Sequence, residues 1–316
     1  MVTFHDIIAA RQHVYRHLRP TPLTFYPGLS KLLDTEVYVK HENHQPIGAF
    51  KVRGGVNLAY HLSASERAAG LATASTGNHG QSIAYAGQVT GTPVTVAMPQ
   101  GANPGKAAAI QALGAEVVFY GEDFDTARLW METRAAEQGK RWVRVTDELL
   151  IAGVGTYALE IVEDLPDVDA IFVPVGGGSG ACGCCLVVGA VNPAITVYGC
   201  QAAAAPAQQL AWRGADASTA PMKTFAEGVA TRIPFEDTQA ILKPGLHDFL
   251  LVEEADIYRA IVTLLEHTHN LVEGAGAIPL AAALQVKADL QGKKVVLVIS
   301  GGNLSLARLR SALDYD

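Results

Sequence analysis

No apolar run in this sequence approaches the roughly 20 residues that a membrane-spanning helix needs. The N-terminal stretch MVTFHDIIAARQHVYRHL has an early aspartate and helical spacing, so it lacks the continuous apolar segment of a secretory signal. No charge of one sign dominates, because 24 basic and 31 acidic side chains leave a net charge of −7. That balance does not indicate a nucleic-acid-binding or basic membrane-surface protein. We therefore expect a cytoplasmic protein without nucleic-acid or membrane partners.

Cysteine is scarce, and its spacing does not favour a metal site. The four cysteines are Cys182, Cys184, Cys185 and Cys200. Zinc ligands usually form C-x₂-C pairs with a second pair further along the chain. Here no second pair follows, and no histidine lies close in the sequence. Free cysteine is among the most buried residue types, so we interpret these residues as small apolar side chains of the core.

The composition indicates a large core, and the pattern indicates the fold class. The chain has 316 residues, of which 49% are hydrophobic and 17% charged, enough for two average domains or one large one. Helical stretches such as GQSIAYAGQV and AIPLAAALQVKADL alternate with short runs rich in valine and isoleucine. This alternation predicts an α/β fold with parallel-rich open sheets flanked by helices. The predicted strands are 36–40, 70–75, 93–98, 115–120, 170–175, 195–199, 248–252 and 294–300.

Glycine-rich turns follow three of these strands. They are STGNHG at 75–80, GGGSG at 176–180 and SGGN at 300–303. Ligands of open α/β sheets bind beyond the carboxyl ends of strands, so the turns predict one cleft built from distant parts of the chain. Each turn alone is weaker evidence, since tight turns use glycine for conformational reasons as well.

The turn after strand 170–175 fits two kinds of phosphate site. Gly178, Gly180 and Gly183 match the dinucleotide fingerprint G-x-G-x-x-G between a strand and a helix. That fingerprint also expects an acidic residue about 20 positions further on, to hold the ribose. Neither an acid nor an arginine stands at the end of the next predicted strand. The nicotinamide interpretation therefore lacks its confirming feature.

The alternative is a cup for a single phosphate monoester. Gly176, Gly177 and Gly178 allow several backbone N–H groups to converge, and Ser179 offers a hydroxyl. A helix expected from about Ala181 adds its positive N-terminus. Such a cup needs no ribose-binding acid.

The stretch IGAFKVRGG places a lysine among small and apolar residues. Lys51 is flanked by Gly48, Ala49, Phe50 and Val52. A partly buried lysine loses its proton at modest pH, and the neutral amine can form a Schiff base. A lysine that snorkels from the start of a helix would leave the same pattern. A single-phosphate cup together with a Schiff-base lysine favours pyridoxal 5′-phosphate as the cofactor.

With these motifs the sequence resembles the threonine/serine dehydratase and serine racemase family, pyridoxal-phosphate enzymes of fold type II (tryptophan-synthase β-like). The resemblance covers nearly the whole chain, and its motifs occur in the family's order. They are KHENHQPIGAFKVRGG, STGNHGQSIAYAG, VPVGGGSG, EGVAT, EGAGA and SGGN. The resemblance implies a large cofactor-binding domain of residues 1–66 and 149–316. It also implies a small mobile domain of residues 67–148 that closes over the cleft.

The resemblance also implies roles around the cofactor ring. Lys51 resembles the lysine that binds the cofactor as a Schiff base and moves the substrate α-proton. Phe50 would pack on the face of the ring, and Asn78 would hydrogen-bond its phenolic oxygen. Ser300 would face the pyridine nitrogen, and Glu273 lies near the ring in relatives.

Two loops complete the implied site. The residues that would hold the phosphate are Gly176, Gly177, Gly178, Ser179 and Gly180. The residues that would bind the substrate carboxylate, at the start of a helix, are Ser75, Thr76, Asn78 and His79. Thr76 is also a candidate catalytic residue, because it stands where serine racemases have their second acid–base serine. Packing of His79 without contact to the substrate is an equal alternative.

Several further residues carry structural interpretations or departures from the family. Arg53 and Glu227 are interpreted as structural. His41 and His44 lie either at the mouth of the cleft or in solvent, and the solvated interpretation is favoured. Gln201 and Ala207 stand where relatives place the acids of a divalent-cation site, so no metal is expected. The chain ends soon after SGGN, so we expect no C-terminal regulatory domain.

The implied reaction is α,β-elimination of a β-hydroxy amino acid, L-threonine or L-serine, to a 2-oxo acid and ammonia. Ser300, as a neutral partner of the ring nitrogen, would make a weak electron sink and favour loss of the β-hydroxyl. Racemisation and dehydration of 3-hydroxyaspartate or an aryl-serine are alternatives, with Arg232 as the candidate cation for a distal carboxylate. A β-replacement synthase and a non-enzymatic cofactor carrier fit less well. A homodimer is expected.

Overall fold

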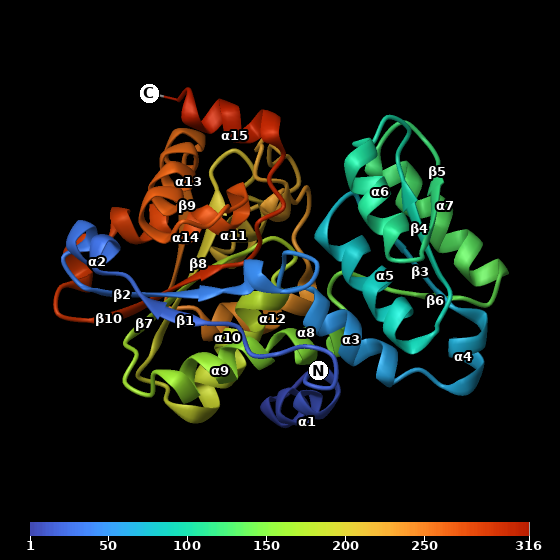
Figure 1. The fold of residues 1–316 in the computed structure, drawn as a ribbon, viewed down its shortest axis with the longest axis horizontal. Coiled ribbons are helices and arrows are strands. Elements are labelled where there is room, and N and C mark those ends of the chain that lie inside the picture. The colour runs from blue at the N-terminus through green and yellow to red at the C-terminus, as the bar shows by residue number, and fades with distance from the viewer. Residues whose placement is uncertain (316) are drawn as a thin grey trace.

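The computed structural model describes residues 1–315, whose strands form two separate sheets (Figure 1). The larger sheet has the order β1-β2-β10-β7-β8-β9, and the smaller has the order β5-β4-β3-β6. The strands are β1 Leu23–Phe25, β2 Glu36–His41, β3 Leu71–Ala74, β4 Val94–Met98, β5 Glu116–Phe119, β6 Arg141–Trp142, β7 Ala170–Pro174, β8 Thr196–Ala202, β9 Asp248–Val252 and β10 Lys294–Ile299.

Helices separate most of the strands, as the sequence pattern predicts. They are α1 Phe4–Val14, α2 Pro27–Leu33, α3 Val52–Tyr60, α4 Ala64–Ala69, α5 Asn78–Thr90, α6 Pro104–Ala112, α7 Phe124–Glu137, α8 Glu148–Val154, α9 Thr156–Asp164, α10 Ser179–Val191, α11 Ala207–Trp212, α12 Glu236–Gly245, α13 Glu254–Thr268, α14 Gly274–Gln285 and α15 Leu306–Leu313. Short 3₁₀ helices are η1 Glu42–His44, η2 Glu227–Val229 and η3 Lys287–Leu290.

Parallel pairing dominates both sheets. In the large sheet only the pairing of β1 with β2 is antiparallel within residues 1–315. The late strand β10 lies between β2 and β7, so distant parts of the chain share one sheet. The predicted α/β class and each predicted strand are confirmed. The sequence pattern missed β1 and β6, which have 3 and 2 residues and are too short to show a period.

Helices cover both faces of the large sheet. Along β7, Ile171 and Val173 pack in a core with residues of α8, α9, α10 and α12. The intervening Ala170 and Phe172 pack on the opposite side, with residues of α2, α13 and α14. Because successive strand side chains point to opposite faces, burial on both sides explains why this strand is apolar throughout.

The small sheet is likewise covered on both faces. Val96 of β4 packs with Ile83 of α5 in one cluster. Its neighbour Ala97 packs with Met131 of α7 in another. The small sheet therefore has a core of its own.

Three helices connect the sheets. The chain leaves the large sheet through α3 and α4 and returns through α8 (Figure 1). Helices α3 and α8 pack closely, since a Cβ at Gly54 of α3 would lie 2.7 Å from Leu150 O of α8. The boundary expected between residues 66 and 67 falls inside α4, and the one between 148 and 149 falls in the first turn of α8. The division into domains and the mobility of the smaller one stay predictions.

None of the helices in the described part of the chain is long and apolar enough to cross a lipid bilayer.

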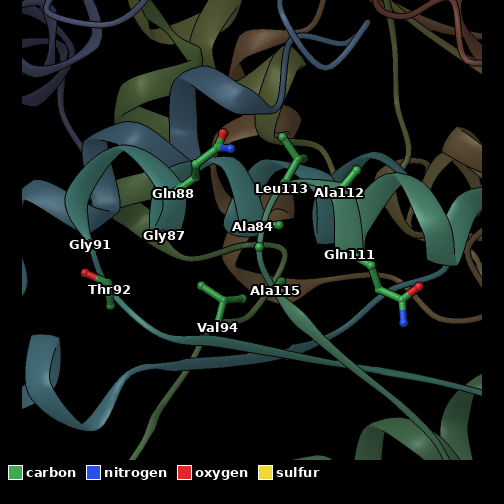
Figure 2. A pocket seen from close by; sticks show the side chains of 11 residues that line it. Ala84, Gly87, Gln88, Gly91, Thr92, Val94, Gln111, Ala112, Leu113 and Ala115 are labelled. Carbon is green, nitrogen blue, oxygen red and sulfur yellow. The ribbon is translucent and has the colours of Figure 1, made fainter.

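A hollow of about 300 Å³ opens beside Ala84, Val94, Leu113 and Ala115 (Figure 2). Val94 begins β4 and Ala115 precedes β5, so the hollow lies at the amino ends of these parallel strands. The predicted cleft lies at their carboxyl ends, so the hollow is separate from it.

Candidate active site

The loops that hold the predicted site residues leave the carboxyl ends of parallel strands. Ser75 follows β3, Gly176 comes shortly after β7, and Ser300 follows β10. This is the edge at which open α/β sheets bind ligands. The two sheets thus contribute their loops to one region, as the glycine-rich turns predict.

The Lys51 segment is fixed by both sheets. Phe50 N–H donates to Ser300 O across 3.0 Å, which ties the segment to the loop after β10. Ser82 of α5 donates from Oγ to Lys51 O across 2.5 Å. The backbone of Lys51 therefore sits at the junction of the two sheets.

The side chain of Lys51 lies in an environment that weakens its charge. Desolvation lowers the pKa of the ammonium to about 8, although the nearby Glu273 carboxylate acts in the opposite direction. The Nζ atom lies 5.1 Å from the ring centroid of Phe50. A neutral amine is thus accessible at mildly alkaline pH, and this is the form that attacks a carbonyl.

The glycine loop, residues 176–178, forms a cradle between β7 and α10. Gly178 has a φ of +96°, which residues with a Cβ rarely adopt. A Cβ at Gly176 would clash with Gly228 O, so no larger residue fits. Among the described residues, none accepts a hydrogen bond from the N–H of Gly176, Gly177 or Gly178. These free donors at the N-terminus of the 13-residue helix α10 fit a phosphate group.

The first turn of α10 packs against the Lys51 segment. The helix begins at Ser179 rather than near Ala181, because Gly178 already serves as its N-cap. A Cβ at Gly180 would lie 3.5 Å from Phe50 Cε2. Tyr157 of α9 donates from Oη to Gly180 O across 2.9 Å, which fixes this turn against α9. The phosphate cup and the predicted ring-stacking residue therefore adjoin.

The loop after β3 reaches across to the large sheet. Ser75 Oγ accepts a hydrogen bond from Gly77 N–H across 3.1 Å, and Thr76 is partly exposed. Asn78 begins α5 and donates from Nδ2 to Glu273 Oε1 across 2.8 Å. The proposed carboxylate loop and the proposed ring contacts thus meet in one place.

The side chain of His79 is buried and hydrogen-bonded to β3 of the small sheet. Its Nε2 lies 2.9 Å from Thr73 Oγ1, and that hydroxyl donates to Val143 O across 3.0 Å. Since the Thr73 proton is committed to Val143, Nε2 is the donor to Thr73. Burial, reinforced by the charge of Lys51, lowers the pKa of His79 to about 3. The imidazole is neutral and its Nε2 faces the protein, which favours the packing interpretation of this side chain.

Glu273 is the N-cap residue of α14, and its backbone N–H donates to Gly301 O across 3.0 Å. Desolvation raises the pKa of its carboxyl to about 7, although the hydrogen bond from Asn78 opposes this. A carboxyl with this pKa can exchange a proton near neutral pH. Its position beside Asn78 agrees with the expectation that it lies near the cofactor ring.

Arg53 belongs to a buried ionic network below the site. Its guanidinium donates to Glu42 across 2.7 Å and to Glu160 across 2.6 Å. Lys40 Nζ lies 2.6 Å from the same Glu160. The structural interpretation of Arg53 fits this network, whose carboxylates the sequence pattern did not identify.

Ion pairs link the rim of the large sheet to the small sheet. Glu227 of η2 pairs with Lys106 of α6. Arg232 Nε lies 3.4 Å from Asp125 of α7, and its side chain is 64% exposed. Arg232 is thus an exposed rim residue with a carboxylate partner, which weakens it as a receptor for a distal substrate carboxylate.

The expectation that His41 is solvated is wrong. His41 is buried, its Nε2 lies 2.8 Å from Tyr26 Oη, and its ring stacks on His44 at 4.8 Å. His44 is exposed, as expected. The difference arises because His41 ends β2, which is covered by β1 on one side and β10 on the other, whereas His44 ends the 3₁₀ turn that follows it.

Gln201, which stands where relatives place an acidic metal ligand, uses its amide to bond other protein groups. Gln201 is buried, and its Nε2 donates to Val229 O across 3.3 Å and to Thr231 Oγ1 across 3.2 Å. Its Oε1 accepts from Gln209 N–H across 3.2 Å. Within residues 1–315, no cluster of three or more His, Cys, Asp or Glu is arranged to hold a metal ion. The side chain of Gln201 is therefore satisfied by protein groups.

The cysteines behave as the sequence predicts. All four are buried and free. Burial raises the pKa of the Cys184 thiol to about 12. Their interpretation as small apolar side chains of the core is confirmed.

Sequence reasoning missed two side chains that touch the predicted site. Asn303 donates from Nδ2 to Asn78 Oδ1 across 2.7 Å. Gln208 donates from Nε2 to Gly176 O across 3.0 Å. Asn303 is the last residue of the SGGN motif, which could have drawn attention to it. Nothing in the local sequence marks Gln208.

Comparison with known proteins agrees with this geometry. A family model described as "Pyridoxal-phosphate dependent enzyme" matches residues 14–301. The chain belongs to this family of pyridoxal-phosphate dependent enzymes. The predicted cofactor and the resemblance identified from the motifs are confirmed.

Relatives within the family include named enzymes and solved structures. The chain is 39% identical over 308 residues to the L-threonine ammonia-lyase of Thermotoga maritima, which covers 97% of this chain and 77% of the relative. Threonine deaminase isoform 2 from Solanum lycopersicum superposes with a TM-score of 0.93 at 31% identity, covering 98% of this chain and 91% of that one. Serine racemase from Dictyostelium discoideum superposes with a TM-score of 0.90 at 31% identity, covering 96% and 99%. The predicted type II fold is confirmed by this likeness.

Proposed function

We propose that this enzyme eliminates water from a β-hydroxy amino acid, L-threonine or L-serine, and releases a 2-oxo acid and ammonia. The similarity to the Thermotoga L-threonine ammonia-lyase supports this reaction class. The observation that carries it is a lysine of lowered pKa whose segment contacts α5 through Ser82 and the turn after the glycine loop through Phe50 and Gly180. Overall, the substrate loses its β-hydroxyl and its α-proton as water, and hydrolysis then replaces the amino nitrogen with oxygen.

The residues present fit pyridoxal phosphate. The free N–H groups of the glycine loop would hold its phosphate, and Phe50 would pack on its ring beside Gly180. Lys51 would bind it covalently, and Ser300 would face the ring nitrogen. When bound, the cofactor withdraws electrons from the substrate α-carbon, which acidifies the α-proton.

The chain itself supplies the proton transfer and the binding of the substrate. Lys51 Nζ, once neutral, accepts the α-proton, and its lowered pKa makes this form available near pH 8. The backbone N–H groups at the start of α5, together with Ser75 and Thr76, would bind the substrate carboxylate. His79 would contribute to this loop through its backbone and its packing on Thr73.

The neutral hydroxyl proposed at the ring nitrogen favours elimination over slower reactions of the substrate such as racemisation. Ser300 is buried at the end of β10, and its backbone oxygen accepts from Phe50 N–H. A hydroxyl does not hold the ring nitrogen protonated as a carboxylate would, so the electron sink is weak. Charge that develops at the α-carbon is then relieved by expulsion of the β-hydroxyl.

Racemisation is the second candidate function. The similarity to the Dictyostelium serine racemase supports it, and Thr76 retains a hydroxyl at the position of interest. Dehydration of 3-hydroxyaspartate is less favoured, since Arg232 pairs with Asp125 at the rim. A β-replacement reaction and a carrier role have no further support.

The experiment that tests this proposal is a substrate panel. The purified enzyme is incubated with L-threonine, L-serine, 3-hydroxyaspartate and an aryl-serine, and release of 2-oxo acid and ammonia is measured. We expect the first two to be the best substrates. A thiol added to the serine reaction should leave ammonia release unchanged, whereas a β-replacement enzyme would retain the amino nitrogen. Absence of oxo acid from the whole panel would refute the dehydratase proposal.

We also propose a cytoplasmic location and a homodimeric state. The four free cysteines suit a reducing compartment. Helix α15 exposes Leu306 and Leu313, apolar side chains that a second copy could cover. Light scattering of the purified protein measures its mass in solution, and a mass of one chain would contradict the dimer.

A further inference from the structure

A chain of buried glutamines stands behind the glycine loop. Gln208 of α11 is fully buried, and its Nε2 donates to Gly176 O across 3.0 Å. Its Oε1 accepts from Nε2 of Gln239 of α12 across 2.7 Å. The same Nε2 of Gln239 also donates to Gln208 O across 2.9 Å. The series Gln239, Gln208, Gly176 therefore runs in one direction.

The direction of this series matters because an amide can be turned either way. If Gln208 were flipped, its carbonyl oxygen would face Gly176 O, and two acceptors would oppose each other. The donor from Gln239 excludes this orientation, because only Oε1 of Gln208 can accept it. Gln239 thereby keeps the Gln208 donor directed at the glycine loop.

The hydrogen bond at Gly176 determines where the next amide points. In a trans peptide the C=O of one residue and the N–H of the next point in opposite directions. Since Gly176 O is directed at Gln208, the N–H of Gly177 is directed away from it. That N–H is one of the free donors of the cup. Glycine is the residue most able to rotate its peptides, so a loop of glycines needs such an external constraint.

We propose that Gln208 and Gln239 form a buried amide relay that positions the phosphate cup by fixing the peptide between Gly176 and Gly177. Both are positioning residues, since neither would touch the cofactor. The proposal rests on the glycine loop being the phosphate site of the proposed function. It does not depend on which amino acid is turned over.

The test compares two ligands that differ in the phosphate. Apoenzyme is titrated with pyridoxal phosphate and with pyridoxal, and each dissociation constant is measured by absorbance. For Gln208→Met we expect the dissociation constant of pyridoxal phosphate to rise at least tenfold and that of pyridoxal to change less than twofold. Gln239→Met should act in the same sense, because Gln208 then loses the donor that fixes its orientation. It keeps the Gln208 side chain in place, so it provides a second test if the Gln208→Met variant does not fold.

Controls separate the relay from the cup and from general damage. Gln209→Met changes the neighbouring glutamine of α11, whose Nε2 makes only a 3.5 Å contact to Phe249 O, and both dissociation constants should stay unchanged. Gly177→Asp places a negative charge in the cup and should weaken pyridoxal phosphate selectively. Equal losses for both ligands in the two relay variants, or no loss, would overturn the proposal. If Gly177→Asp changes the dissociation constant of neither ligand, the phosphate cup is misassigned and the relay proposal is wrong as well. A wrong substrate assignment leaves these titrations unaffected.

Discussion

Asn78 Nδ2 donates a 2.8 Å hydrogen bond to Glu273 Oε1, which joins the start of α5 on the small sheet to the start of α14 beside the large sheet. Asn303 fixes the orientation of the Asn78 amide, because its Nδ2 donates to Asn78 Oδ1 and to Ile47 O. The amide of Asn78 thus presents its donor side to Glu273. The protonation of Glu273 is consequently coupled to the contact between the two sheets.

Replacement of Glu273 should change how stability depends on pH. The pKa of its carboxyl is raised to about 7 in the folded protein, from an ordinary value of 4.5. The folded state therefore binds more protons between these values, and the free energy of unfolding falls as pH rises from about 4.5 to 7. Glu273→Gln removes this loss. We expect apoenzyme with this substitution to match the wild type near pH 4.5 and to exceed it by about 1–3 kcal/mol above pH 7.

Urea unfolding of apoenzyme at several pH values measures this difference. Glu122→Gln, which changes an exposed carboxylate, is the control for the substitution itself. A Glu273→Gln difference that is the same at pH 5 and pH 8 would contradict the prediction.

Replacement of Lys51 should abolish covalent binding of the cofactor. Purified wild type should be yellow, and borohydride should fix the pyridoxyl group to a peptide that contains Lys51. Lys51→Ala should lose the label and at least a thousandfold in turnover, since it removes the proposed nucleophile and base together. Lys106→Ala serves as the control lysine and should keep the label. Full turnover in Lys51→Ala would show that another residue carries the chemistry.

The ion pair between Lys106 and Glu227 joins the small sheet to the rim of the large sheet. It should therefore favour the closed form of the predicted cleft and strengthen substrate binding modestly. Exposed pairs contribute about 0.2–1 kcal/mol, so Lys106→Met and Glu227→Gln should each raise KM by up to about fivefold. The double variant should be no worse than either single one, because one interaction is lost in all three. Raising the salt concentration should shrink these differences. Additive effects of the two substitutions would argue against an ion pair that favours the closed cleft.

Divalent metal should not be required for activity. The buried amide of Gln201 makes three hydrogen bonds where an anionic oxygen would be needed to hold a hard cation. We expect full activity after dialysis against a chelator, measured as release of 2-oxo acid. Loss of activity on chelation with recovery on adding magnesium would reveal a site elsewhere.

Elimination should exceed racemisation with L-serine. Thr76 carries a hydroxyl, but its extra methyl restricts χ1 and takes up space beside the α-carbon. We expect at most a trace of D-serine by chiral chromatography while pyruvate accumulates. Formation of D-serine faster than pyruvate would reverse this ranking. In that case Thr76→Ala should abolish racemisation and spare elimination.

Local sequence was enough to predict most of the fold. The strand 170–175 is apolar throughout and the strand 294–300 is apolar from Val295 to Ile299, and the structure buries both faces of these stretches. The turns that follow them contain the glycines that a left-handed or crowded backbone requires, such as Gly178 and Gly176. These properties belong to short segments, so periodicity and turn chemistry reveal them. The two-residue strand β6 has too few side chains to show a period.

What the sequence determined by itself is therefore the positions of most strands along the chain, the glycine turns at their ends and the residue types available for catalysis. Only the tertiary structure decided the partners of those residues, because they lie far apart in the chain. Gln208 reaches Gly176 across 32 positions, and Asn78 reaches Glu273 across 195. The lowered pKa of Lys51 and the raised pKa of Glu273 likewise come mainly from desolvation in the folded protein. Hydrogen bonding and burial act through space over a few ångströms, so their consequences arise only once the chain has folded.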